Sequence, residues 1–309
     1  MSELTPAIQP RCPICGALDA QQVLDRGPYR VVRCQRCQLQ YAHPMPTPTD
    51  LMAYYQDLTY FEGSATEGYA DYAGMEQVLR PLAERRLRQI ETRTDGPGRV
   101  LDFGCAGGFF LDQARRHGWQ IAGVELSQPM AERAAALLQI PIATNLARLT
   151  DPHGTFDVIT LWEVIEHLPD PLAVLAQLRF WLKPGGWLAL STPNTGHWQA
   201  LAAPDQWTSY RPPAHVLYLA EPTLRSLLAQ AGFTAVQIWR SGPRPYLPGW
   251  LDRVTQPLQQ GLADGSAKSW RWSLYAWRAI RLGALLTYRF SASRRDVHMT
   301  LEAIGRLRP

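Results

Sequence analysis

A strand, a glycine-rich turn, a helix and a second strand follow one another near the middle of the chain, and this order constrains the fold most. Arg99–Phe103 is a short apolar strand, and residues 104–108 (Gly-Cys-Ala-Gly-Gly) form a tight turn. Phe109–His117 is predicted to be helical, and the second strand, Trp119–Glu125, ends in an acid. In such units the strands are parallel, and a ligand lies at their carboxyl ends beside the turn. We therefore predict a ligand site at the glycine turn and Glu125.

The glycine turn lacks the spacing of a dinucleotide site. A dinucleotide fingerprint requires G-x-G-x-x-G, and residues 104–108 contain no such window. Asp102 stands two residues before the first glycine and 23 residues before Glu125. An acid at the position of Asp102 is atypical of nicotinamide sites and fits a ligand with a cationic amino-acid end. The acid at the position of Glu125 suits ribose hydroxyls.

Strands and helices continue to alternate toward residue 191. Ser127–Leu138 and Leu172–Leu182 have helical patterns, and Pro141–Thr144, Phe156–Leu161 and Trp187–Ser191 have strand patterns. Alternation at this pace predicts a parallel sheet that is covered by helices on both faces. The predicted fold class is α/β with a doubly wound sheet.

Four of the five cysteines form two C-x-x-C pairs near the start of the chain. They are Cys12, Cys15, Cys34 and Cys37, with eighteen residues between the pairs. Two residues between thiolates let both sulfurs of a pair bind one ion, and two pairs complete a closed tetrahedral zinc site. Gly16 follows the first pair and can supply the positive φ of a tight turn. Redox cysteines are the alternative, but neither pair has the βαβ context of such motifs. We expect structural Zn²⁺ in a small zinc ribbon.

Four motifs in order resemble the class I S-adenosylmethionine-dependent methyltransferases. They are Leu-Asp-Phe-Gly-Cys-Ala-Gly-Gly at 101–108, Gly-Val-Glu-Leu-Ser at 123–127, the stretch 156–171, and Leu-Lys-Pro-Gly-Gly at 182–186. The chain most resembles members with an N-terminal zinc ribbon. Its core is similar to that of ubiquinone-biosynthesis O-methyltransferases, and zinc-bearing sugar methyltransferases share its layout. The resemblance implies a Rossmann-like seven-stranded sheet, with the sixth strand at 233–240, the seventh at 297–306, and a helical insertion before the last strand.

The resemblance also implies a cofactor, S-adenosylmethionine, and the residues that bind it. Its methionine end would border Asp102 and the glycine turn, its ribose Glu125 and its adenine Leu126. Two departures stand out: Ala106 replaces the family's middle glycine, and residues 144–146 (Thr-Asn-Leu) replace a segment that often carries an adenine-binding acid. The expected cofactor-binding residues are Asp102, Gly104, Ala106, Gly108, Glu125, Leu126, Asn145, Trp162 and Glu163.

Two histidines are the predicted catalytic residues. His167 follows the fourth strand, and His215 lies in the loop after the fifth. Methyl transfer to a hydroxyl requires alignment of the reactants and a group that accepts the hydroxyl proton. Each histidine has a structural alternative: His167 can organise its loop, and His215 can hydrogen-bond to the sheet. Trp162, Trp198 and Trp207 are candidates for lining the acceptor pocket, with core packing as the alternative.

A basic segment follows the sixth predicted strand. Residues 240–309 carry twelve basic and four acidic side chains, whereas residues 51–239 carry fourteen basic and nineteen acidic ones. Lys268–Tyr288 is predicted to be an aromatic-rich helix with a stripe of arginines, which suits an anionic membrane surface. A core-packed or dimer-forming helix is the alternative. The expected partners are a small-molecule or lipid-linked acceptor, with peripheral membrane contact through 268–295 or a homodimer as further alternatives.

The predicted domains are a zinc ribbon at 1–48, a helical lid or linker at 49–95, and a methyltransferase domain at 96–309 with a helical insertion at 241–296. No apolar run approaches the roughly 20 residues of a membrane span. The first residues lack the basic-then-apolar pattern of a signal peptide. We expect a cytoplasmic protein, with a peripheral position at the inner membrane face as the alternative.

The predicted function is methyl transfer from S-adenosylmethionine to a small-molecule, sugar or lipid-linked acceptor, with O-methylation favoured. The alternatives are C-methylation of an activated sugar, and methylation of RNA with the ribbon holding the nucleic acid. Nucleic-acid binders need a basic footprint. The ribbon is close to neutral, and four thiolates around Zn²⁺ add a net charge of about −2. We therefore do not expect a nucleic-acid partner.

Overall fold

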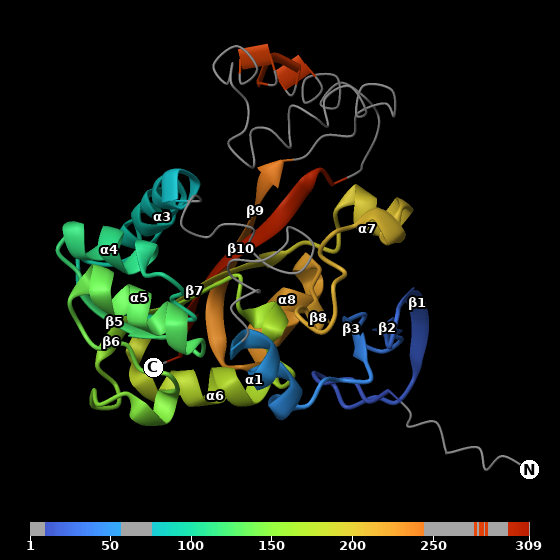
Figure 1. Cartoon of the computed structure of the whole chain (residues 1–309), viewed down its shortest axis with the longest axis horizontal. Coiled ribbons are helices and arrows are strands. Elements are labelled where there is room, and N and C mark those ends of the chain that lie inside the picture. Colours follow the sequence, from blue (N-terminus) through green and yellow to red (C-terminus); the bar gives the residue numbers. More distant parts are fainter. Residues whose placement is uncertain are drawn as a thin grey trace, which may run out of the picture.

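The computed structural model describes residues 10–56, 76–243, 275–276, 278–280, 282–283 and 296–308 (Figure 1). Its larger sheet has six strands in the order β5-β4-β6-β7-β10-β9. They are β4 (Arg99–Phe103), β5 (Gln120–Val124), β6 (Phe156–Trp162), β7 (Leu182–Pro193), β9 (Phe233–Pro243) and β10 (His298–Leu307). The first four are parallel, and β10 is antiparallel to both of its neighbours. The α/β fold class is confirmed.

Helices cover both faces of this sheet. They are α3 (Glu76–Glu91), α4 (Phe109–Arg116), α5 (Gln128–Leu138), α6 (Pro171–Trp181) and α8 (Glu221–Gln230). Because successive side chains of a strand point to opposite faces, Val100 and Val158 join the core with α3, α4 and α5. Leu101 and Ile159 join the core with α6 and α8. The strands therefore carry apolar side chains on both faces, as parallel strands between two helical layers require.

The predicted third strand is reduced to a single bridge. Ala143 pairs with Val124 in parallel. Its N–H donates to Gly123 O at 3.1 Å, and the Glu125 N–H donates to Ala143 O at 2.9 Å. The sheet thus has six strands and one bridge in place of seven strands. A second difference lies at β7. This strand begins at Leu182 and includes residues 183–186, whereas the predicted strand begins at Trp187.

A second sheet contains the cysteine pairs. Its order is β1-β2-β3-β8, with β1 (Ala20–Arg26), β2 (Tyr29–Cys34), β3 (Gln40–His43) and β8 (Leu217–Tyr218). Strands β1 and β2 are antiparallel and are joined by a tight turn at Gly27, which has φ +61°. In Figure 1 this sheet lies on the opposite side of the molecule from α3, α4 and α5. Strand β8 lies at Leu217–Tyr218, far along the chain from the ribbon predicted at 1–48. The predicted domain limits therefore stay predictions.

The loop that contains β8 runs from the end of β7 to α8. It also holds a short helix, α7 (Trp198–Ala202), and a 3₁₀ turn, η3 (Pro204–Gln206). Two further 3₁₀ turns, η1 (Leu146–Arg148) and η2 (Ile165–His167), follow the carboxyl ends of the sheet. These irregular segments surround the edge where the predicted site lies.

Helix α1 (Pro48–Gln56) follows the ribbon. Its cap is Thr47, whose Oγ1 accepts the Asp50 N–H at 3.2 Å, while Asp50 Oδ2 accepts the Thr47 N–H at 3.1 Å. This reciprocal pair is a capping box, which fixes the start of the helix. Among the described helices, none combines the length and apolar composition needed to cross a bilayer.

Candidate functional site

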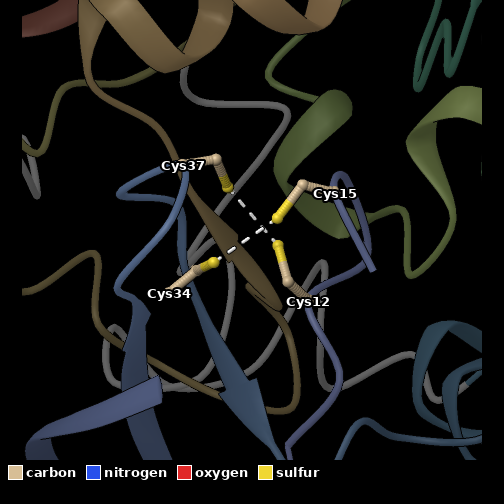
Figure 2. A group of neighbouring side chains, drawn as sticks. All are labelled: Cys12, Cys15, Cys34 and Cys37. Atoms are coloured by element: carbon tan, nitrogen blue, oxygen red, sulfur yellow. Dashed lines mark hydrogen bonds between the residues drawn. The ribbon is translucent and has the colours of Figure 1, made fainter. Parts of the chain in front are cut away.

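The four cysteines of the two C-x-x-C pairs converge on one point (Figure 2). Cys12 Sγ lies 3.5 Å from Cys37 Sγ, and Cys15 Sγ lies 3.5 Å from Cys34 Sγ. All four sulfurs lie within 4.8 Å of one another, and none is in a disulfide. A tetrahedron with Zn–S bonds of about 2.3 Å has edges of about 3.8 Å. The donor set therefore fits a closed four-thiolate zinc site.

The two cysteine turns share one backbone geometry. The Gly16 N–H donates to Cys12 O at 2.9 Å, and the Gln38 N–H donates to Cys34 O at 3.0 Å. Gly16 has φ +69° and Gln38 has φ +63°. The sequence predicts the left-handed residue at Gly16 only, because glutamine gives no signal for that conformation. The fixed sulfurs thus impose the same turn on two different residues.

A cavity of about 440 Å³ opens at the carboxyl ends of β4, β5 and β6. Seven of the nine predicted cofactor-binding residues line it: Gly104, Ala106, Glu125, Leu126, Asn145, Trp162 and Glu163. Leu51 and Met52 of α1 and Leu168 complete part of the wall, and α1 belongs to the segment predicted to be a helical lid or linker. The volume lies in the range of small-molecule sites.

Glu125 follows β5 and lies almost buried at the cavity wall. Its Oε2 accepts the Ala106 N–H at 2.8 Å, and its Oε1 accepts the Ser127 N–H at 2.8 Å. Burial raises the pKa of Glu125, and these backbone donors oppose the rise. A carboxylate oxygen can accept more than one hydrogen bond. Glu125 is therefore oriented by the backbone with acceptor capacity left for ligand hydroxyls.

The glycine turn passes the cavity in left-handed backbone. Gly104 has φ +81°, Ala106 has φ +44° and Gly108 has φ +83°. Ala106 is strained there, because its Cβ disfavours positive φ. Gly108 lies away from the cavity lining; a Cβ at this position would lie 3.0 Å from Leu138 Cδ1 of α5. Its glycine is required by the packing of α4 on α5.

Asp102 lies behind the turn and does not line the cavity. It is 2% exposed and accepts the Thr160 hydroxyl at 2.6 Å. Burial raises the pKa of Asp102 to about 7, although the hydrogen bond from Thr160 acts to lower it.

The turn after β6 brings Trp162 and Glu163 to the cavity. Glu163 has φ +55°, and its N–H donates to Ser191 Oγ at 3.1 Å. The Arg86 guanidinium lies 4.4 Å from the Trp162 ring centroid and 3.7 Å from Glu163 Oε1. Trp162 Nε1 is buried and has no hydrogen-bond partner among the described residues. This indole nitrogen is enclosed by protein atoms, so the Trp162 ring contributes to the wall through its apolar surface.

The sequence did not predict the buried ion pair behind this turn. Arg86 of α3 is 7% exposed and lies 3.3 Å from Glu302 of β10. Glu302 also accepts the Trp239 indole N–H at 2.7 Å. The positive charge of Arg86 lowers the pKa of Glu302, overcoming burial, which alone would raise it. The partners lie 216 residues apart in the chain, so no local pattern could have paired them.

Of the two predicted catalytic histidines, His167 lines the cavity. Its Nδ1 lies 2.7 Å from Ala214 O. Burial lowers the pKa of His167 to about 4, while the carbonyls of Ala214 and Glu163 favour the protonated ring. At neutral pH His167 is therefore an uncharged imidazole beside groups that stabilise an imidazolium.

His215 lies behind His167 and outside the cavity lining. The two rings meet edge to face, with centroids 4.8 Å apart. His215 Nδ1 donates to Ser209 O at 3.0 Å, and Nε2 accepts from Arg211 Nη2 at 3.0 Å. Burial lowers the pKa of His215 well below its usual range, and the charges of His167 and Arg211 add to this. His215 is thus held as a neutral ring within the loop.

Glu166 completes a buried group with the two histidines. Ligand atoms of Glu166, His167 and His215 lie within 4.8 Å of one another. Burial raises the pKa of Glu166 well above its usual range, and the charge of Glu163 adds to the rise. Arg211 donates to the lone pair of His215 that a cation would need. Both carboxylate oxygens of Glu166 are buried without a hydrogen-bond partner among the described residues, so we describe the three residues as a buried cluster.

The other two predicted pocket tryptophans lie elsewhere. Trp207 is fully buried and packs on Tyr210, with ring centroids 4.5 Å apart. Trp198 lines a second cavity of about 470 Å³ near the start of α8, where Arg240 pairs with Glu221 and Asp296. Two thirds of the predicted basic helix at 268–288 falls outside the described residues, so its membrane or dimer role stays a prediction.

A protein-family comparison now bears on the fold and the site. A family described as a methyltransferase domain matches residues 75–238, slightly more than half of the chain. The chain belongs to this methyltransferase family. The match begins at α3 and spans the glycine turn, the cavity wall and the loop of His215, so the predicted family is confirmed.

Among curated relatives, the methyltransferase domain is similar to the ubiquinone biosynthesis O-methyltransferase of Xanthomonas campestris. The two are 32% identical over 160 residues, which are 49% of this chain and 66% of the relative. The chain therefore spans less than two thirds of the length of the relative.

Two solved structures share the fold of this methyltransferase. A SAM-dependent methyltransferase from Archaeoglobus fulgidus has TM-score 0.51 and 19% identity, covering 76% of this chain and 100% of that one. Phosphoethanolamine N-methyltransferase 2 from Haemonchus contortus was solved with phosphomonomethylethanolamine and S-adenosylhomocysteine. It has TM-score 0.51 and 15% identity, covering 85% of this chain and 61% of that one. At these identities the likeness concerns the fold.

Proposed function

We propose that this protein transfers a methyl group from S-adenosylmethionine to a small-molecule, sugar or lipid-linked acceptor, with a hydroxyl oxygen as the favoured target. The observation that carries this proposal is the cavity at the carboxyl ends of β4, β5 and β6. Residues chosen from sequence for cofactor binding line its wall, and His167 lines it as well. The curated relative is named as an O-methyltransferase, which supports oxygen as the target.

The residues present fit the cofactor. Glu125 would hold the two ribose hydroxyls, because its carboxylate is oriented by two backbone donors. Leu126 and Asn145 would flank the adenine. Glu163 would meet the ammonium of the methionine end. Charge-assisted hydrogen bonds of this kind supply most of the orientation in a small site.

The cofactor supplies an activated methyl group on a sulfonium. The chain has two tasks: to align the acceptor with that methyl group, and to accept the proton that the acceptor hydroxyl releases. His167 is the proposed proton acceptor. It rests as a neutral ring because burial lowers its pKa. Once protonated, it would be stabilised by the carbonyls of Ala214 and Glu163. We assign His215 to holding the loop, because it lies outside the cavity lining and its Nε2 accepts from Arg211.

We also propose that the four cysteines bind one structural Zn²⁺. A closed set of four thiolates leaves no coordination position for a substrate, so the ion contributes stability rather than chemistry. Metal analysis of the purified chain tests this: one zinc per chain is expected, and a chain that folds without metal would overturn it.

Methylation is tested directly with S-adenosylmethionine carrying a labelled methyl group. The chain is incubated with panels of phenolic and catecholic compounds, nucleotide-activated sugars, lipid extract and RNA, and the labelled product is identified. We expect label on an oxygen of one panel member. Label on a sugar carbon would establish the C-methylation alternative, and label on RNA would establish the nucleic-acid alternative. Binding of the cofactor without transfer to any panel would contradict the proposed acceptor classes.

A further inference from the structure

The loop after β7 lies between the zinc ribbon and the cavity wall. Trp207, Tyr210 and Tyr218 from this loop form one core with Leu24 and Val31 of the ribbon. The Tyr210 ring stacks edge to face on both of the other rings, at 4.5 and 4.9 Å between centroids. The ribbon therefore supplies the apolar partners that this largely irregular loop needs to bury its aromatic rings.

Polar contacts join the same two segments. The Tyr210 hydroxyl donates to Gln40 Oε1 of β3 at 2.5 Å. Burial raises the pKa of Tyr210 to about 12, so the hydroxyl stays protonated. Arg26 of β1 donates to the backbone oxygens of Tyr210, at 2.9 Å, and Asp205, at 2.8 Å. Both ribbon residues thus fix the loop upstream of Ala214.

Two further hydrogen bonds carry the connection from the loop to the cavity. The Ala42 N–H of β3 donates to Val216 O at 2.9 Å, and the Val216 N–H donates to Glu166 O at 2.8 Å. His167, the next residue, has its Nδ1 2.7 Å from Ala214 O. One layer of loop backbone, residues 214–216, therefore separates β3 of the ribbon from a side chain that lines the cavity.

The cysteines determine where β3 lies. Cys34 is the last residue of β2, and Cys37 stands three residues before β3. An ion that binds both sulfurs fixes the turn between these strands. Strand β3 then pairs with β2 on one side and with β8 of the loop on the other.

We propose that the zinc ribbon positions the acceptor side of the cavity, and that Tyr210 is a positioning residue that acts on His167 through the Ala214 carbonyl. This inference rests on the proposed function, because it gives His167 a task in the reaction. Under this proposal the ribbon has a role at the cavity and is not merely a peripheral docking module. Loss of zinc or of the Tyr210 hydroxyl would alter the hydrogen bonding of the His167 ring and leave the Glu125 side of the cavity intact.

The test uses the full chain with ¹⁵N-labelled histidine. The ring nitrogen shifts report tautomer and protonation, and a His167→Gln variant assigns the His167 signals. We compare the zinc-loaded chain, the chain after chelation, Tyr210→Phe, and the matched control Tyr29→Phe, which removes a hydroxyl from β2. Affinity for S-adenosylhomocysteine is measured by calorimetry on the same samples.

We expect the His167 shifts to move after chelation and in Tyr210→Phe, to return when zinc is added back, and to stay unchanged in Tyr29→Phe. Affinity for S-adenosylhomocysteine should change by less than about threefold. Unchanged His167 shifts in Tyr210→Phe would overturn the inference even if the chelated chain unfolds. Absence of S-adenosylhomocysteine binding in the unmodified chain would instead contradict the proposed function.

Discussion

The zinc ribbon and the six-stranded sheet are both β structures, but different interactions hold them together. Strand β1 of the ribbon is largely exposed, whereas β10 of the large sheet has a run of buried residues. The ribbon depends on four sulfurs within 4.8 Å of one another. The large sheet depends on apolar cores on both faces and on the buried Arg86–Glu302 pair. The ribbon thus adds a local four-sulfur cluster to its apolar contacts with the loop after β7, whereas the large sheet is fixed by many distributed contacts.

This difference predicts that the two sheets respond differently to side-chain substitutions. A four-thiolate site is lost when one ligand is removed, because each thiolate is a quarter of the coordination shell. A packed core loses only the contribution of the altered side chain. The five predictions below test this contrast, starting with the largest effect.

The largest effect is expected for Cys34→Ser in the ribbon. Structural zinc sites contribute about 10–16 kcal/mol of apparent binding free energy in small modules. We expect zinc content to fall from one to none per chain, with rapid hydrogen exchange at β1, β2 and β3. The matched control is Cys105→Ser, a buried cysteine outside the cluster, which should keep its zinc. A Cys34→Ser chain with full zinc content would show that the four-thiolate account is wrong.

In the large sheet, Glu302→Gln should cost about 3–5 kcal/mol of unfolding free energy, because it removes the carboxylate that pairs with both Arg85 and the buried Arg86 and leaves Arg86 with the more distant Glu163 alone. Denaturant unfolding measures this. The control is Glu221→Gln, a surface acid that also pairs with two arginines and should cost about 1 kcal/mol or less. Equal costs for the two variants would refute a role for the buried pair.

At the cavity, Glu125→Ala should weaken S-adenosylhomocysteine binding about 100-fold. Hydrogen bonds to a charged group contribute about 1.5–3 kcal/mol each, and two ribose hydroxyls are involved. Calorimetry gives the affinity. Glu132→Ala, an exposed acid on α5, is the control and should bind normally. A Glu125→Ala chain that binds as tightly as the unmodified one would remove Glu125 from the site.

His167 and His215 should lower stability as pH drops from about 6.5 toward 4, whereas the buried acids Asp102, Glu125 and Glu166 oppose this loss because burial raises their pKa values. The folded chain keeps His167 neutral down to a pKa of about 4 and His215 to well below its usual range, whereas the unfolded chain takes up protons near pH 6.5. The unfolded state is then favoured, by up to about 1.4 kcal/mol per pH unit for each histidine. Denaturant unfolding at pH 7.5 and 5.5 measures the slope. His215→Asn should reduce it, and His153→Asn on the exposed surface should not; equal slopes in all three chains would exclude these groups.

The smallest effect is expected for Ala106→Gly. The left-handed backbone at φ +44° costs a non-glycine residue about 1–2 kcal/mol, and glycine's greater freedom when unfolded offsets about 0.5–1 kcal/mol of that. A gain of up to about 1 kcal/mol in unfolding free energy is expected. Ala136→Gly, exposed in α5, should instead lose about 1 kcal/mol. A loss at both positions would show that Ala106 is unstrained.

The parts that could be predicted from sequence are those with local patterns. The cysteine spacing, the glycine turn and the acid that ends β5 each depend on residues close together in the chain. Three features were missed because they have no local pattern: the left-handed backbone at Gln38, the pairing of β3 with β8, and the Arg86–Glu302 pair. A left-handed glutamine has no sequence signal, and the two pairings join segments far apart in the chain.

A crystal structure of the full chain with S-adenosylhomocysteine tests the central claim most directly. The account predicts one ligand in the cavity at the carboxyl ends of β4, β5 and β6, with its ribose hydroxyls on Glu125 and its adenine between Leu126 and Asn145. A ligand in the second cavity, beside Trp198 and Arg240, or no bound ligand at saturating concentration, would contradict it.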